Sequence, residues 1–365
     1  MPLSSSLGPV RTTTPRDPER AHPARSYQLL RDTVRDAGLM RRTPVFYWGL
    51  LGALVLGVGG VVTGFVLFGD SWFQLLMAGV LGILFTQLAF LGHEATHRQI
   101  FESWRANEWL GRTLSIVTGL SYDWWMNKHT RHHGNPNQVG ADPDIAPDTV
   151  VFTDEDASRA KGLHGALVRR QGWLFFPLIT LEGLNLHRLS LWHLIRPGST
   201  AKHRWLEAGL LLARHAAYLS AVFLCLPLGM AFAFLGIQLA VFGVYMGASF
   251  APNHIGMPII PAGERLDFLS KQVLTSRNLV GGWWATALFG GLNHQVEHHL
   301  FPGMPRPHLA RAREIVRDVC RSEGIHYTEE TIGRAYANVI AYLNRVGLNA
   351  QDPFTCAMAA AYRRR

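Results

Sequence analysis

The chain has 365 residues and a formal net charge of +9, and it is 48% hydrophobic but only 17% charged. Such an apolar composition excludes a typical soluble protein and indicates a membrane protein with substantial soluble parts. A basic surface suits nucleic acid, anionic lipid or a phosphate-bearing substrate, and the apolar stretches favour lipid or a phosphorylated acyl carrier over nucleic acid. The three cysteines form no C-x-x-C pair, which excludes a zinc ribbon and a disulfide framework.

The N-terminal segment is rich in Ser, Thr, Pro and Arg over roughly residues 1–25 and is typical of a disordered tail. We divide the chain into a flexible tail with a lead-in helix (1–40), one central domain (41–320) and a C-terminal cytosolic tail (321–365).

Two charge-free stretches follow, 46–68 and 72–92, each long enough to cross a hydrocarbon core of about 30 Å. Only the short segment around Gly69-Asp70-Ser71 separates them, so they form a hairpin whose open ends lie on one side of the membrane. The preceding segment carries eight arginines against four acids. By the positive-inside rule, that side is cytoplasmic.

A second hairpin is predicted at about 205–226 and 230–250, with its turn at Pro227-Leu228-Gly229. Residues 93–204 contain apolar patches too short to span, such as 172–184, and we expect amphipathic helices at the membrane interface there. From His254 onward the chain is predicted to be cytosolic, with helical patterning over about 307–346. The expected fold is therefore an all-α integral membrane protein, with four transmembrane helices in two hairpins and a cytosolic helical cap.

Histidines are concentrated in this predicted cap. The sequence "HEATH" contains His93 and His97 and matches the H-E-x-x-H pattern of zinc metalloproteases. Further groups are "HTRHH", "NHIG" and "QVEHH"; they contribute His129, His132, His133, His254, His298 and His299. Because two complete hairpins return the chain to the same side, all of these groups can meet at one membrane-proximal site.

The spacing within the groups agrees with that placement, because residues at i, i+3 and i+4 share one helix face. A catalytic zinc ion takes only three protein ligands, whereas these groups provide eight histidines. Eight imidazoles imply two metal ions, each with four or five nitrogens. Imidazole-rich sites without sulfur suit iron, copper, zinc or nickel, so the ligand type alone does not name the metal.

Three of these four histidine groups, in this order, resemble the histidine boxes of the membrane fatty acid desaturases. "HEATH" is similar to the first box, "HTRHH" to the second and "QVEHH" to the third in its Q-x-x-H-H form. Flanking words such as "HHGNPNQVGADPDIAP" and "FAPNHIGMP" resemble the family as well. The similarity covers about residues 40–320.

The resemblance implies a pair of iron ions as cofactor and eight histidine ligands. These are His93, His97, His129, His132, His133, His254, His298 and His299. Gln295 stands where some relatives have another ligating histidine; it either ligates through its carbonyl oxygen or holds a water. His294 is offset by one position and would point away from the ligand face. Glu94 and Glu297 lie among the ligands, and we expect them to be either outer carboxylates that orient histidine N–H groups or solvated charges.

The other histidines have no matching partners and are not expected to be ligands: His22, His164, His187, His193, His203, His215, His308 and His326. Four basic residues near the third box and tail, Lys271, Arg277, Arg306 and Arg311, are candidate phosphate contacts or solvated charges. Tryptophans such as those in "GGWWATALF" mark the membrane interface or line an acyl tunnel.

The resemblance implies an O2-dependent fatty acyl desaturase that acts on an acyl-CoA, an acyl-lipid or an acyl-carrier protein. The sequence contains no "HPGG" haem-binding word, so we expect electrons from a separate ferredoxin or reductase. We expect an integral protein of a bacterial plasma membrane with both termini cytoplasmic. A hydroxylase or acetylenase on the same scaffold is an alternative. Two alternatives come from other functional classes. One is an intramembrane zinc protease that uses "HEATH", and the other is a non-enzymatic metal or haem carrier.

Overall fold

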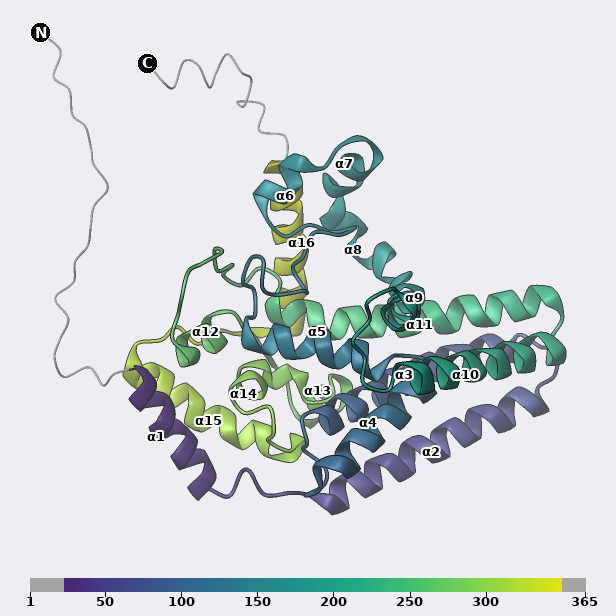
Figure 1. Ribbon diagram of the computed structural model, residues 1–365, viewed down its shortest axis with the longest axis horizontal. Coiled ribbons are helices and arrows are strands. Elements are labelled where there is room, and N and C mark those ends of the chain that lie inside the picture. Colours follow the sequence, from purple (N-terminus) through teal and green to yellow (C-terminus); the bar gives the residue numbers. More distant parts are fainter. Residues whose placement is uncertain (1–22, 350–365) are drawn as a thin grey trace, which may run out of the picture.

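A computed structural model describes residues 23–349 of the chain, so most of the predicted disordered tail and the last part of the C-terminal tail lie outside the described residues. Within the described range the protein is mostly helical (Figure 1). Among residues 23–349, four helices are long and apolar enough to cross a membrane, which confirms the predicted spans. They are α2 (Pro44–Leu67), α3 (Phe73–Thr96), α10 (Arg204–Cys225) and α11 (Leu228–His254).

Two of these helices extend beyond their predicted ends. The charge-free stretch ends at Gly92, but α3 continues through His93 to Thr96 and stops where Arg98 adopts a left-handed backbone with φ of 58°. In the same way α11 continues to His254. The length of the uncharged stretch shows how many residues can lie in the hydrocarbon core of a bilayer. The helix itself continues until its backbone hydrogen bonding ends. Both extensions bring histidines into regular helix.

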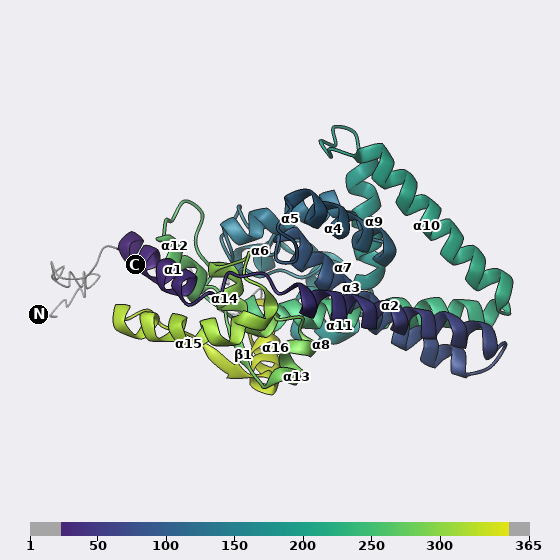
Figure 2. The ribbon, with the colours of Figure 1, turned by 90° about the horizontal axis from the view of Figure 1, so that it is seen from below.

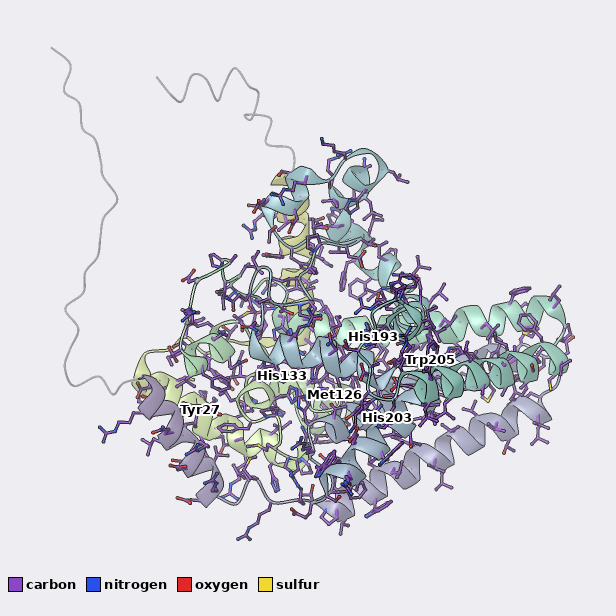
Figure 3. The ribbon with its side chains drawn as sticks, in the orientation of Figure 1. Tyr27, Met126, His133, His193, His203 and Trp205 are labelled. Atoms are coloured by element: carbon purple, nitrogen blue, oxygen red, sulfur yellow. The ribbon has the colours of Figure 1, made fainter. Side chains whose placement is uncertain are left out.

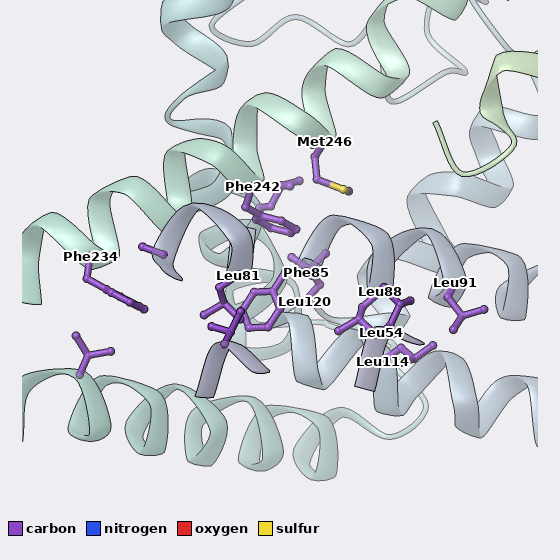
Figure 4. Packing of buried hydrophobic residues seen from close by; sticks show 14 of the residues in the cluster. Leu54, Leu81, Phe85, Leu88, Leu91, Leu114, Leu120, Phe234, Phe242 and Met246 are labelled. Carbon is purple, nitrogen blue, oxygen red and sulfur yellow. The ribbon is translucent and has the colours of Figure 1, made fainter. Parts of the chain in front are cut away.

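The transmembrane helices pack closely where they cross. Leu81 and Phe85 of α3 face Phe242 and Met246 of α11 (Figure 4). A Cβ on Gly82 would lie 2.8 Å from the carbonyl oxygen of Gln238, so the absence of a side chain there lets the backbones approach. In a lipid environment such van der Waals packing, rather than exclusion of water, is the main source of helix association.

Between the hairpins lie six helices: α4 (Trp104–Thr118), α5 (Tyr122–Gly134), α6 (Asp154–Arg159), α7 (Gly162–Val168), α8 (Gln171–Ile179) and α9 (Glu182–Ile195). Helix α4 returns alongside α3, and its end is held by Arg214 of α10, whose Nε donates to the Val117 carbonyl at 3.1 Å. A cation at this C-terminus satisfies a carbonyl that would otherwise lack a partner. Arg214 is thus tied to α4 rather than left as an isolated charge in the span.

The C-terminal part wraps around the ends of α3 and α11. It comprises α12 (Phe268–Leu274), β1 (Asn278–Val280), α13 (Trp283–Leu288), the 3-10 helix η1 (Leu292–His294), α14 (Gln295–Leu300), α15 (Arg306–Glu323), β2 (Glu329–Thr331) and α16 (Ile332–Asn349). The helical patterning expected over 307–346 corresponds to α15 and α16, but Gly324 at φ 68° ends α15 and β2 intervenes. Strand β2 pairs in parallel with β1, with Asn278 opposite Glu329.

The molecule therefore has two parts that the figures show side by side. The long helices project together to one side, and the shorter helices gather around the other ends of α3 and α11 (Figures 1 and 2). Helix α1 (Pro23–Asp36) lies against α12 and α15 in this gathered part. Which side of a membrane this part faces stays a prediction.

Candidate metal centre

The predicted ligand histidines come from four helices that converge, most of them from the last turn of a helix. His93 and His97 come from the end of α3, and His254 is the last residue of α11. Helix α5 supplies His129, His132 and His133, the last of which is labelled in Figure 3. His298 and His299 lie on the short helix α14. Ser121 helps to fix α5, because its side chain accepts a hydrogen bond from the Trp124 N–H and caps the helix.

Five of these histidines form one group, within which each residue has a ring nitrogen within 4.8 Å of those of the others: His93, His97, His129, His133 and His298. The Nε2 atoms of His97 and His129 are 2.8 Å apart, and those of His93 and His129 are 2.9 Å apart. His133 and His298 approach through Nε2 at 3.1 Å. The nitrogens therefore converge on one point, as the ligands of a single ion do.

His132, His254 and His299 form a second group by the same criterion. The two groups adjoin, because the rings of His133 and His299 stack with centroids 4.3 Å apart. The eight predicted histidines are thus divided five and three, rather than four or five to each ion. Gln295 lies beside the smaller group, with its Nε2 2.8 Å from His254 Nε2.

Outer partners fix the rings of this second group. His132 Nδ1 lies 3.0 Å from an Asp142 carboxylate oxygen, His254 Nδ1 lies 2.9 Å from the Thr275 carbonyl, and His299 Nδ1 lies 2.8 Å from Gln272 Oε1. Each acceptor requires the proton to be on Nδ1, so each Nε2 presents a lone pair. Metal-ligating histidines characteristically have such partners on the other ring nitrogen.

The lone pair of His299 provides a test of whether a metal fits. Its Nε2 is buried and has no hydrogen-bond partner among the described residues. A buried polar atom without a partner is rare and calls for an explanation. A cation at the meeting point of His132, His254 and His299 would supply the missing interaction, so the residues present fit a metal ion.

Burial also keeps five of the imidazoles outside the spans uncharged; His132 differs, because the carboxylates of Asp144 and Asp142 outweigh burial and raise its pKa. Burial lowers the pKa of His97 to about 3. Burial, reinforced by the neighbouring histidines, holds the pKa values of His129, His133, His298 and His299 well below the ordinary value. Neutral imidazole is the form that binds metal, so at neutral pH these side chains do not have to release a proton first.

The two glutamates do not contact the histidines that they were expected to orient. Glu94 accepts hydrogen bonds from Arg306 Nε at 2.8 Å and from the Tyr47 hydroxyl at 3.2 Å. Glu297 accepts from Asn278 Nδ2 at 2.7 Å and from the Tyr327 hydroxyl at 2.6 Å. Both are buried, so neither is a solvated charge. Their partners lie far away in the sequence and were not recognisable from it.

Two of the candidate phosphate contacts were wrong. Arg306 is only 4% exposed and pairs with Glu94, and Arg277 is 3% exposed and pairs with Glu330. Carboxylate partners, Glu94 buried and Glu330 partly exposed, pair with these guanidinium groups. The sequence showed only that both residues are positively charged.

The outer partners Asp142, Gln272 and Thr275 were missed by sequence reasoning. Asp142 lies in the word that follows the second histidine group, ten residues after His132. An acidic residue shortly after a histidine pair was the one sequence feature that could have indicated this partner. Gln272 and Thr275 lie on or just after α12 and carried no signal of their own.

Replacing Asp142 with Asn is expected to weaken metal binding by about 10–100-fold, as is usual for outer partners of metal-bound histidines. The amide can present its N–H to His132 and thereby destabilise the Nδ1-protonated ring. Metal affinity, measured by competition with a chelator, tests this expectation. Asp148→Asn, outside the centre, is the control. Unchanged affinity in Asp142→Asn would show that the carboxylate does not orient the ligand.

A cavity of about 250 Å³ lies beside the histidines. It runs between α5 and α11 and reaches His129, His132, His254 and Gln295, while aromatic and aliphatic side chains supply most of the remaining wall. An apolar cavity that converges on a few polar groups is typical of a ligand site.

Comparisons with known proteins agree with this geometry. The sequence model of the family described as fatty acid desaturase matches residues 70–331. The Delta(8)-fatty-acid desaturase of Helianthus annuus is 26% identical over 356 residues, which cover 90% of this chain and 74% of that protein. The acyl-lipid (9-3)-desaturase of Physcomitrium patens is 27% identical over 290 residues, or 76% of this chain and 54% of that protein. The Delta 8-(E)-sphingolipid desaturase of Kluyveromyces lactis is 28% identical over 361 residues, which cover 92% of this chain and 61% of that protein.

The chain therefore spans about three quarters of the first relative and less than two thirds of the other two. These relatives are eukaryotic, so they give no support to the expected bacterial plasma membrane. The match nevertheless covers more than half of the chain and includes all eight converging histidines. The chain belongs to the fatty acid desaturase family.

Proposed function

We propose that this protein is an O2-dependent fatty acyl desaturase with a histidine-bound pair of iron ions. The observation that carries the proposal is the convergence of eight histidines in two adjoining groups beside an apolar cavity. When bound there, two iron ions would supply the activation of O2 and the removal of two hydrogens from adjacent methylenes.

The protein's own residues perform the remaining tasks. His93, His97, His129, His133 and His298 would hold one ion, and His132, His254 and His299 the other, with Gln295 beside His254. Asp142 and Gln272 hold the protons of His132 and His299 on the outward nitrogen. The apolar cavity wall positions the chain and excludes water from the reacting carbons.

The substrate is proposed to be an acyl chain whose polar carrier stays outside the cavity. The names of the relatives include an acyl-lipid desaturase and a sphingolipid desaturase, which favours a chain held in a lipid over one held by CoA or a carrier protein. We propose a ferredoxin or a reductase as the separate electron donor and a membrane orientation with the metal centre on the cytoplasmic side.

The zinc protease alternative is disfavoured by the surroundings of Glu94. A protease of this type needs that carboxylate as a general base, but here Arg306 and Tyr47 occupy it. A hydroxylase or acetylenase uses the same histidines and differs only in its product.

Metal analysis together with fatty acid profiling tests the proposal. The purified protein is expected to contain about two irons per chain, and cells that express it with a suitable donor are expected to accumulate an unsaturated product absent from control cells. One zinc and no iron would overturn the proposal. A hydroxylated or acetylenic product would identify the protein as a hydroxylase or an acetylenase with the same metal centre.

A further inference from the structure

The cavity beside the metal centre ends at a wall of three side chains. Trp125, Met246 and Phe250 line the cavity of about 250 Å³ and also line a second, smaller cavity of about 20 Å³ on their other side. We call these three residues the partition. The smaller cavity is bounded further by Ala89, Gly92, Ser115 and Thr118, among others. Space therefore continues beyond the partition.

The other end of the large cavity lies at the surface. Phe152, Gly256, Ile259 and Tyr342 line both the large cavity and an open surface hollow next to it. Gly256 follows the end of α11, whereas Met246 lies inside the apolar span of that helix.

This arrangement fixes the direction in which a chain would lie. Burying a polar head without hydrogen-bond partners is unfavourable, so the head stays at the surface hollow and the methyl end points toward the partition. Met246 precedes His254 by eight residues, which at 1.5 Å per residue is roughly 12 Å along the helix axis. The carbons beyond the metal centre must fit within that length.

The three partition residues differ in how they are held. The Trp125 ring stacks on His129 with centroids 4.9 Å apart, and Phe250 contacts Trp125 at 5.9 Å and His93 at 6.5 Å. Both aromatic residues are therefore tied to ligand histidines. Met246 has no such ring contact; it is unbranched and flexible, and its volume can change without moving a ligand.

We propose that Met246 sets the maximum number of carbons that an acyl chain can have between the reacting bond and its methyl end. This inference rests on the proposed desaturase function and adds the determinant of its chain-length selectivity. Truncating Met246 joins the two cavities and makes room toward Ser115 and Thr118. Enlarging Met246 closes the large cavity nearer to the metal centre.

The test compares the unaltered protein with Met246→Ala and Met246→Phe over saturated acyl substrates of increasing length. The longest chain desaturated is expected to grow by about two to three carbons in Met246→Ala, which removes three heavy atoms, and to shorten in Met246→Phe. KM should change more than kcat for chains near the limit. Met230→Ala makes the same substitution on the same helix outside both cavities, and its limit is expected to stay unchanged.

A second measurement does not depend on turnover. The longest saturated fatty acid that raises the melting temperature of each purified variant should follow the same order. Met246→Phe creates no void, so its shorter limit stays readable if Met246→Ala unfolds. Desaturation with one common limit in all variants would overturn the inference alone. No desaturation by the unaltered protein, with no iron bound, would overturn the proposed function and the inference with it.

Discussion

Replacing His299 with Ala is expected to remove iron from the protein and to abolish desaturation. His299 is one of only three imidazoles in the second group, and its buried Nε2 has no partner among the described residues. Loss of one of the three ligand nitrogens should lower the affinity for iron by more than the roughly 10–100-fold loss expected when an outer partner such as Asp142 is replaced. The protein should then bind about one iron per chain or fewer.

The measurement is iron per chain in the purified variant, with circular dichroism to show that the helices are retained. His164→Ala is the matched control, because His164 is exposed and lies outside both groups. It is expected to retain about two irons and full activity. A His299→Ala protein with two irons and normal turnover would remove His299 from the ligand set.

Replacing Arg306 with Ala is expected to destabilise the protein by about 3–5 kcal/mol, because it leaves a buried carboxylate without its counter-charge. Arg306 and Glu94 are 4% and 2% exposed, and their ion pair joins α15 to the end of α3, next to His93. The melting temperature in detergent should fall by on the order of 10 °C.

Two further variants distinguish a buried charge from simple loss of packing. Arg306→Met combined with Glu94→Leu removes both charges and should recover much of the lost stability, since a buried ion pair can be replaced by apolar residues of similar volume. Arg321→Ala breaks the exposed pair with Asp318 and should cost at most about 1 kcal/mol. If Arg306→Ala melted like Arg321→Ala, the pair would have no structural importance.

The same ion pair determines what Glu94→Gln should do. Its carboxylate contacts Arg306 and Tyr47 rather than a histidine, so the variant should retain measurable desaturation while losing some stability. His93→Ala should abolish activity. Equal loss in the two variants would indicate that Glu94 takes part in the chemistry.

The sequence was sufficient for the four spans and for the choice of ligand histidines to test, because both depend on local properties. An uncharged stretch of about 20 residues is long enough for a bilayer whatever surrounds it. Histidines three or four residues apart share a helix face wherever the helix lies. The short strands β1 and β2 were not foreseen, since each has only three residues and depends on its partner for hydrogen bonds.

Only the tertiary structure decided how these pieces combine. It divided the histidines into groups of five and three, gave Asp142, Gln272 and Thr275 to the outer nitrogens of the smaller group, and paired Glu94 with Arg306, which lies 212 positions further along the chain. It also enclosed a cavity that ends at Met246. Such contacts depend on which helix faces pack together, and residue spacing along a single helix carries no information about that packing.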